Sequence, residues 1–354
     1  MSSYGMSFAH RKSRWMEGQG PSQDVVISSR IRLARNLKDY PFPPMMTEDK
    51  AREVLNLGCE ISEALNHEGS AEYSWYPLEK LDSMERQVLI EKHLISPQLL
   101  RSAAISGVII SRDEAVSIMV NEEDHFRIQC LFSGMDLEAA WSLADRLDSD
   151  IAGHVTYAFD DEFGYLTTCP TNLGTGLRGS VMTHLPGLVL TEQLSRIVSG
   201  LSKVGAVVRG LYGEGSQAEG SLYQISNHVT LGHSESEIVD NLNSIVSEVV
   251  RRERSAREAL LNRNRVKLED RVYRAYGILT NARSIAASEA IELLSLVRLG
   301  VVLGILTHIP IAVFPELIVG TRRASIQQKA GAHLDSDQRD LQRANLIRKR
   351  LLAE

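Results

Sequence analysis

Cysteine is scarce in this sequence of 354 residues, and signals for export are missing. The three cysteines, Cys59, Cys130 and Cys169, form no CxxC pair, so the sequence does not predict a disulfide framework. Residues 1–15 contain no apolar segment of the kind found in signal peptides. We therefore expect a protein of the reducing cytoplasm.

Long hydrophobic runs are also missing, apart from one segment. Leu299–Phe314 is shorter than the roughly 20 apolar residues that span a membrane. It also contains Thr307, His308 and Pro310. We expect a buried or dimer-facing helix that ends in a proline turn, and no association with a membrane.

The overall charge of the chain gives no indication of a nucleic-acid partner. The formal net charge is -6, so any phosphate binding requires a local cluster of cations. The sequence has no GxxxxGK[ST] loop, and Asp161–Gly164 has one residue too many for the DFG motif of protein kinases. If ATP binds here, arginines must take the role that lysine has in those folds.

The pattern of apolar residues predicts a mixed domain followed by a helical one. Helices are predicted at Leu137–Leu147 and Thr191–Leu201. A capping box at Ser234 and Glu237 starts a long helical region, and we place the domains at residues 1–254 and 255–354. The predicted strands are Gly107–Ile110, Ala115–Asn121, Phe126–Phe132, His154–Phe159, Tyr165–Cys169, Ala206–Leu211 and Ser221–Ser226.

Two arginines in Ser28–Asn36 suggest a phosphate-binding strand. If this segment is extended, Arg30 and Arg32 point to the same face. Adjacent guanidinium groups repel one another unless an anion lies between them, and a polyphosphate provides one. A solvated edge strand explains the same pattern equally well.

Three further segments combine charge with strand ends or glycine-rich loops. Asn121–Arg127 places three acids after an apolar strand, where a carboxylate can orient a guanidinium, although acidic turns are common without a function. Thr168–Ser180 joins a thiol and a cation to a loop whose glycines allow a ligand close to the backbone. Arg209–Ser216 fits a closing lid that carries Glu214, or a plain hairpin loop.

The four segments SSRIR, NEEDHFR, TCPTNLGTGLR and RGLYGE, in this order, resemble the phosphagen kinase superfamily of creatine and arginine kinases. The resemblance covers about residues 20–255. It implies an α+β fold with a largely antiparallel sheet flanked by helices. It also implies ATP as the phosphoryl donor, with Mg²⁺ carried by the nucleotide, since the sequence shows no metal-ligand set of its own.

The resemblance also implies roles for individual residues. Glu123 and Glu214 resemble the carboxylates that hold the guanidinium, with Glu123 as the base. Glu122 lies beside it, and Cys169 resembles the thiolate near the substrate nitrogen. Met182 stands where the family commonly has histidine, so the adenine and ribose contacts of its segment stay open. The implied nucleotide-binding residues are Ser28, Ser29, Arg30, Ile31, Arg32, His93, Arg127, Arg178, Gly179, Ser180, Val181, Met182, Arg209, Gly210, Leu211, Tyr212 and Gly213.

The whole chain is similar to the bacterial protein arginine kinases of the McsB type, for example at Glu91–Pro97 and Gly153–Asp160. Kinases of small guanidino compounds carry a helical domain before the first arginine strand, whereas 27 residues precede Ser28 here. We therefore expect arginine side chains of proteins as substrates. The resemblance further implies a homodimer, an McsA-type activator, delivery of substrates to the Clp protease machinery and regulation of a stress repressor.

One C-terminal motif suggests a second site. Asp337–Ala344 is predicted to be helical with its cap at Ser336, and spacing alone favours a solvated basic face. In the protein arginine kinases an RDxxRA motif is associated with an allosteric phosphoarginine pocket. The residues implied are Arg339, Asp340, Arg343 and Ala344.

Two other functions stay open from the sequence. A phosphagen kinase that acts on free arginine would transfer label from γ-labelled ATP only to the free amino acid. A non-catalytic phosphoarginine-binding adaptor would tolerate Glu123→Ala and Cys169→Ala.

Overall fold

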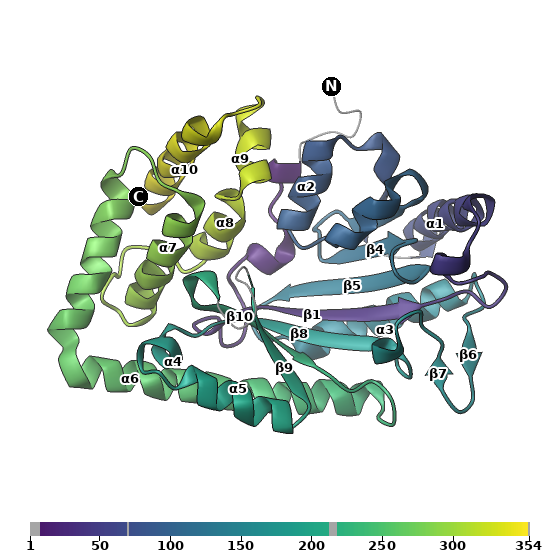
Figure 1. Ribbon diagram of the computed structural model, residues 1–354, viewed down its shortest axis with the longest axis horizontal. Helices are drawn as coiled ribbons and strands as arrows, with labels where there is room; N and C mark the ends of the chain where they lie inside the picture. Colours follow the sequence, from purple (N-terminus) through teal and green to yellow (C-terminus); the bar gives the residue numbers. More distant parts are fainter. Residues whose placement is uncertain (1–7, 69–70, 212–217, 353–354) are drawn as a thin grey trace.

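A single eight-stranded sheet organises the first two thirds of the chain. The computed structural model describes residues 8–68, 71–211 and 218–352. The strand order is β2-β3-β4-β5-β1-β8-β10-β9, and all neighbouring strands are antiparallel, which confirms the predicted α+β fold (Figure 1). The strands are β1 (Val26–Arg35), β2 (Tyr73–Pro77), β3 (Gly107–Ser111), β4 (Val116–Val120), β5 (Phe126–Ser133), β8 (Leu177–His184), β9 (Ala206–Gly210) and β10 (Leu222–Asn227).

Strand β1, near the centre of the sheet, divides its side chains between two environments. Ile31 and Leu33 are fully buried in the main hydrophobic core. Helices α1 (Glu48–Glu68), α3 (Leu137–Ala152) and α6 (Glu235–Asn281) contribute to this core. Because successive strand residues point to opposite faces, Arg30 and Arg32 lie together on the other face.

The second face of the sheet is covered in part by the C-terminal helices. Leu131, which pairs with Arg30 across β1 and β5, packs with Trp15 and Met182. The same cluster contains Ile291 of α7 (Ala287–Val302) and Ile318 of α8 (Val313–Gly320). The face that carries the arginines is therefore bordered by the helical part of the chain.

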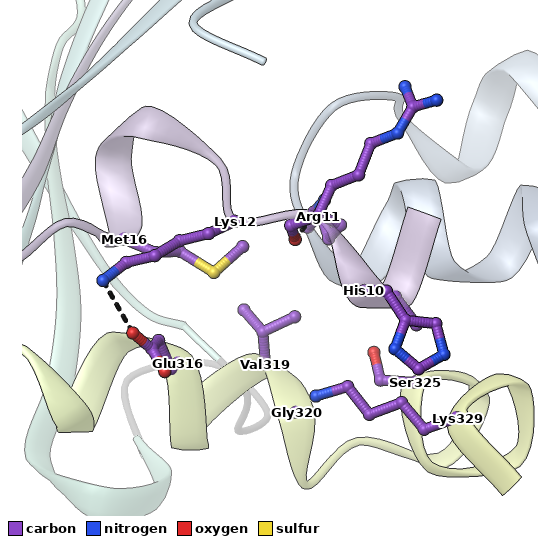
Figure 2. A pocket seen from close by; sticks show the side chains of 11 residues that line it. His10, Arg11, Lys12, Met16, Glu316, Val319, Gly320, Ser325 and Lys329 are labelled. Carbon is purple, nitrogen blue, oxygen red and sulfur yellow. Dashed lines mark hydrogen bonds and ion pairs between the residues drawn. The ribbon is translucent and has the colours of Figure 1, made fainter. Parts of the chain in front are cut away.

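A short N-terminal segment joins these two parts. The buried Lys92 donates hydrogen bonds to the carbonyls of Phe8 (3.0 Å) and Arg11 (3.1 Å) and pairs with the buried Glu114. On its other side, Lys12 lies 2.6 Å from Glu316 of α8, and the two flank a small cavity of about 120 Å³ (Figure 2). Residues 8–16 thus bridge the sheet and the C-terminal helices.

The C-terminal helices begin with the long helix α6. The predicted capping box at Ser234 and Glu237 is present, and the helix bends at Asn264, which has φ -162° and ψ 79°. Helix α6 is continuous across residues 254 and 255, where we drew the boundary between domains. It is followed by α7, α8, α9 (Arg323–Ala330) and α10 (Ser336–Leu351).

The prediction for Leu299–Phe314 as one helix is wrong. Helix α7 ends at Val302, Gly304 adopts a left-handed conformation (φ 69°), and α8 starts only at Val313. Within the described residues no helix is both long enough and apolar enough to cross a membrane. The predicted cap of the last helix is also wrong, because Asp335 rather than Ser336 accepts the hydrogen bond from the Gln338 backbone.

Two predicted strands, His154–Phe159 and Tyr165–Cys169, are mostly irregular. Only a two-stranded hairpin forms there, β6 (Phe159–Asp160) and β7 (Gly164–Tyr165). The remaining backbone bonds to loops instead, for example Ala158 N to the Asn36 carbonyl (2.7 Å). The helix predicted from Thr191 begins later, as α5 (Leu194–Lys203), after the short α4 (Pro186–Leu190).

Candidate active site

The arginines of β1 meet those of neighbouring strands on the face away from the core. Arg30 donates from Nε to Ser180 Oγ and from Nη2 to Gln224 Oε1, both at 3.2 Å. Arg178 of β8 stands directly opposite Arg32 in the antiparallel register. The prediction that Arg30 and Arg32 share one face of the sheet is confirmed. Arg178 on the neighbouring strand lies on the same face.

This cluster of like charges is electrostatically unfavourable by itself. Burial lowers the pKa of Arg30 to about 10, with further lowering from Arg127 and Arg178. The pKa of Arg32 falls well below its usual value, first from burial and then from the charges of Arg30, Arg127 and Arg178. The buried Nε atoms of Arg32 and Arg178 have no hydrogen-bond acceptor among the described residues. A polyphosphate would supply both the missing acceptors and the missing negative charge.

Two carboxylates flank Arg127 at the start of β5. Glu122 is completely covered, lies 2.7 Å from Arg127 Nη1 and accepts a 2.6 Å hydrogen bond from Ser96. Glu123 lies 2.8 Å from Arg127 Nη2, and its side chain is about one third exposed. Glu123 lines a cavity beside Arg127. The Glu122 carboxylate is instead occupied by its contacts with Arg127 and Ser96.

The loop with Cys169 lies against the same cavity. Its thiol is 3.0 Å from Thr171 Oγ1. The fully buried Asp124 fixes this loop, because its carboxylate accepts from Thr168 N and from Asn36 Nδ2, both at 2.7 Å. Sequence reasoning missed Asp124 as a positioning residue, and its place between two acids and a histidine in NEEDH was the only signal.

Cys169, Glu123 and three arginines line one cavity. It has a volume of about 210 Å³ and is bordered by Arg32, Arg127 and Arg178. A larger cavity of about 510 Å³ shares Arg32 and Arg127 and continues past Arg30 and His93. The structure thus brings Cys169, Glu123, His93 and the predicted arginines Arg30, Arg32, Arg127 and Arg178 together around two adjoining cavities.

His93 lines the larger cavity and the small recess beside it. Its backbone is in the left-handed region (φ 61°), and its carbonyl accepts a 2.8 Å hydrogen bond from Gln129. Its ring centroid lies 5.7 Å from that of Trp15. Burial, with smaller contributions from Arg30 and Arg322, lowers the pKa of His93 to about 3, so the ring is neutral at physiological pH.

The other sequence-predicted nucleotide residues are divided between the two faces. Ser28, Ser180, Met182 and Leu211 line a small recess beside Arg30 and His93. Ile31 and Val181 are buried in the opposite core, and a Cβ added to Gly179 would meet Leu242 there. The side chains of Ile31 and Val181 therefore cannot contact a ligand in the cavity, and a side chain at position 179 would point into the same core. The Ser29 hydroxyl donates a 2.8 Å hydrogen bond to the Gly134 carbonyl.

The fourth predicted segment is only partly described. Arg209 and Gly210 end strand β9, and Arg209 is exposed but close enough to Arg178 to lower its pKa further. Tyr212, Gly213 and Glu214 lie outside the described residues. Across the described ranges, no group of three His, Cys, Asp or Glu side chains is arranged to hold a metal ion.

Comparison with known proteins identifies the family. Residues 56–256 match the family described as ATP:guanido phosphotransferase, C-terminal catalytic domain, and residues 265–354 match the protein-arginine kinase McsB C-terminal domain. The chain is 50% identical over 342 residues to the protein-arginine kinase of Moorella thermoacetica, covering 96% of this chain and 98% of that one. It is 48% identical over 339 residues to that of Brevibacillus brevis, covering 96% and 95%. This chain belongs to the protein-arginine kinase family.

Solved structures of other guanidino kinases share the fold. A lombricine kinase superimposes with a TM-score of 0.58 at 29% identity, over 68% of both chains. The duplicated taurocyamine kinase of Schistosoma mansoni, with bound transition-state analogue components, gives 0.58 at 27% identity, over 69% of this chain and 36% of that one. The fold of the protein-arginine kinase family is thus that of the phosphagen kinases.

The arginines of the C-terminal RDxxRA motif make hydrogen bonds within the chain. Arg343 is buried and donates 2.8 Å hydrogen bonds to the carbonyls of Thr321 and Ile285, and it also pairs with Asp340. Arg339 donates to the Leu334 carbonyl at 2.7 Å. Ala344 is buried in the helical core. Both arginines of the motif therefore already make hydrogen bonds within the chain.

The neutral buried histidines predict that this kinase loses stability in mild acid. The pKa values of His93 (about 3) and His125 (about 4) are lowered by burial, whereas unfolded histidine titrates near 6.5. The unfolded chain therefore binds more protons below pH 6.5, and stability falls by up to about 1.4 kcal/mol per pH unit for each histidine.

Urea unfolding at pH 7, 6 and 5 measures this slope. We expect His93→Leu to reduce the dependence of the unfolding free energy on pH. His67→Gln, at an exposed position of α1, should leave this dependence unchanged. A slope that is the same in all three proteins would contradict the assignment.

Proposed function

We propose that this protein transfers the γ-phosphoryl group of ATP to the guanidinium of arginine side chains in proteins. The convergence of Glu123 and Cys169 with Arg32, Arg127 and Arg178 around one cavity is the observation that supports this most directly. A planar cation fits beside the carboxylate and the thiol, and a polyanion fits beside the arginines. Membership of the protein-arginine kinase family provides independent support.

The arginines stabilise the phosphate charge during transfer. Arg30, Arg32, Arg127 and Arg178 surround the position of the phosphates, and phosphoryl transfer depends mainly on positioning and on such electrostatic stabilisation. Mg²⁺ bound with the nucleotide neutralises further phosphate charge, and the protein supplies no separate metal cluster in this proposal. Glu122 acts as a positioning residue, because it holds Arg127 and does not face the cavity.

Glu123 deprotonates the acceptor in this mechanism. A guanidinium is a poor nucleophile because it is protonated and its lone pairs are delocalised. As its nitrogen attacks the γ-phosphorus, a P–N bond forms, the bond to the ADP oxygen breaks, and the proton moves to the Glu123 carboxylate. Cys169 lies near the same acceptor position, and Glu214 supplies the second carboxylate by resemblance.

Labelling with [γ-³²P]ATP tests the proposal. We expect label on an arginine-containing protein such as casein, with the acid lability of a P–N bond and the alkali stability that serine phosphate lacks. Free arginine is the competing acceptor in a parallel reaction. Label only on free arginine would favour a phosphagen kinase, and no label on either would favour a phosphoarginine-binding adaptor.

The finer physiological roles follow from the resemblance to the protein arginine kinases. We propose that phosphorylation in the cytoplasm marks proteins for Clp-type degradation and regulates a stress repressor, with an McsA-type activator. We also propose a homodimer formed through residues 255–354 and an allosteric phosphoarginine site at Arg339, Asp340, Arg343 and Ala344.

A further inference from the structure

One wall of the nucleotide cavity comes from the C-terminal helices. Arg322 immediately precedes α9 and lines the 510 Å³ cavity together with Arg30, Arg32, His93 and Arg127. All the other arginines of this cavity belong to the sheet. The nucleotide site is therefore built from both parts of the chain.

Helix α9 is attached to the segment that carries His93. The Glu91 carboxylate accepts hydrogen bonds from the backbone N–H groups of Ala324 and Ser325, both at 2.8 Å, and from Ser325 Oγ at 2.7 Å. Glu91 ends α2 (Ser83–Glu91), two residues before His93. This cap satisfies free N–H groups at the start of α9 and so fixes the position of Arg322 at the cavity wall.

A second contact fixes Arg322 from the side of α10. Arg343 Nε donates a 2.8 Å hydrogen bond to the carbonyl of Thr321, the residue directly before Arg322. Both Arg343 and Thr321 are buried. Arg322 is thus preceded and followed by backbone that other elements hold in place.

The charges around Arg322 favour an anionic ligand. Arg30 and Arg322 each contribute, after burial, to the lowered pKa of His93, so positive charge acts on this ring from both residues. Arg322 also acts on Glu91, whose pKa burial raises overall. Among the described residues that line the cavity, Glu91 is the only carboxylate, and it is already bound to the start of α9, so guanidinium groups outnumber carboxylates there.

We propose that Arg322 is a nucleotide-binding residue, contributed by the C-terminal helices, which contacts the phosphate groups of ATP. The inference rests on the proposed function only in taking ATP as the ligand. A purely structural role explains less, because Glu91 already caps α9 without the Arg322 side chain. Its neighbour Arg323 is exposed and does not line the cavity.

Nucleotide binding to the full chain tests this directly. By isothermal titration we expect Arg322→Ala to bind ADP about tenfold more weakly, as for loss of one charge-assisted hydrogen bond, and Arg322→Lys to recover part of the affinity. Arg323→Ala is the matched control, with unchanged affinity. In turnover, the KM for ATP should rise while the KM for the protein substrate stays constant.

The outcomes separate this inference from the proposed function. Because ADP binding needs no acceptor, it can be measured even if arginine phosphorylation fails. A loss of affinity for ADP that is absent for adenosine supports a phosphate contact. Unchanged ADP affinity in a folded Arg322→Ala protein would overturn the inference, and so would an equal loss for adenosine and ADP. Thermal unfolding without nucleotide confirms that the variants fold.

Discussion

Glu123→Gln should lower kcat by about 10²–10⁴-fold, the usual contribution of a general base. The substitution keeps the size of the side chain but removes the group that accepts the guanidinium proton. Binding of ADP should be preserved or slightly tighter, because Arg127 then loses one of its two carboxylate partners and is more available to phosphate. Single-turnover labelling measures the chemical step, and titration measures nucleotide affinity.

The control for this variant is Glu162→Gln in the exposed turn between β6 and β7. It removes the same charge at a distance from the cavity lining and should retain wild-type kcat. If Glu123→Gln also retained its kcat, the assignment of Glu123 as the base would be refuted. A parallel loss of ADP affinity would instead place Glu123 among the residues that organise the phosphate site.

Arg32→Ala should reduce kcat/KM for ATP by about 10²–10³-fold, comparable to losing one preorganised donor to transition-state charge. The free protein should behave differently. Its stability should stay equal to wild type or rise, because the substitution removes a cation that is buried among Arg30, Arg127 and Arg178 with an unsatisfied Nε. Function and stability are therefore predicted to change in opposite directions.

Thermal unfolding with and without ATP distinguishes these effects. Wild type should gain stability on adding nucleotide, and Arg32→Ala should lose most of that gain. Arg112→Ala, at a side chain that is 84% exposed, is the matched control and should keep it. Marked destabilisation of Arg32→Ala without nucleotide would contradict the view that the arginine cluster is unfavourable until an anion binds.

Local sequence patterns predicted the fold class and one part of the site. Alternation along β1 is a property of any strand, so the common face of Arg30 and Arg32 followed from their spacing. The strands β3, β4, β5, β9 and β10 were predicted within a few residues for the same reason. His154–Phe159 and Tyr165–Cys169 failed because their backbone groups bond to distant loops, which local propensity does not register.

The assembly of the site required long-range contacts. Asp124 joins the NEEDHFR turn to the Thr168 loop, and this bond between residues 44 positions apart leaves no periodic pattern in the sequence. The distinction between Glu122 and Glu123 also depends on packing, because Ser96 and Arg127 cover one carboxylate and leave the other facing the cavity. The resemblance grouped these residues, but their different environments arise only from packing in the folded chain.

Arg322 had no distinguishing signal in the sequence. It is one of two adjacent arginines, Arg322 and Arg323, in a helical region with many others. Its place at the cavity depends on the Glu91 contact, which joins residues more than 230 positions apart. Sequence reasoning assigned the C-terminal helices to assembly and regulation and did not consider a contribution to the nucleotide site.

The hydrogen bond from Arg343 to the Thr321 carbonyl links the C-terminal motif to Arg322 and so to the nucleotide cavity. A compound that drew the Arg343 guanidinium away from the Thr321 carbonyl would break this bond and loosen the chain next to Arg322. Its free energy of binding would then include the cost of disturbing the ATP pocket. By linkage, bound ATP would change the affinity for that compound by the same factor.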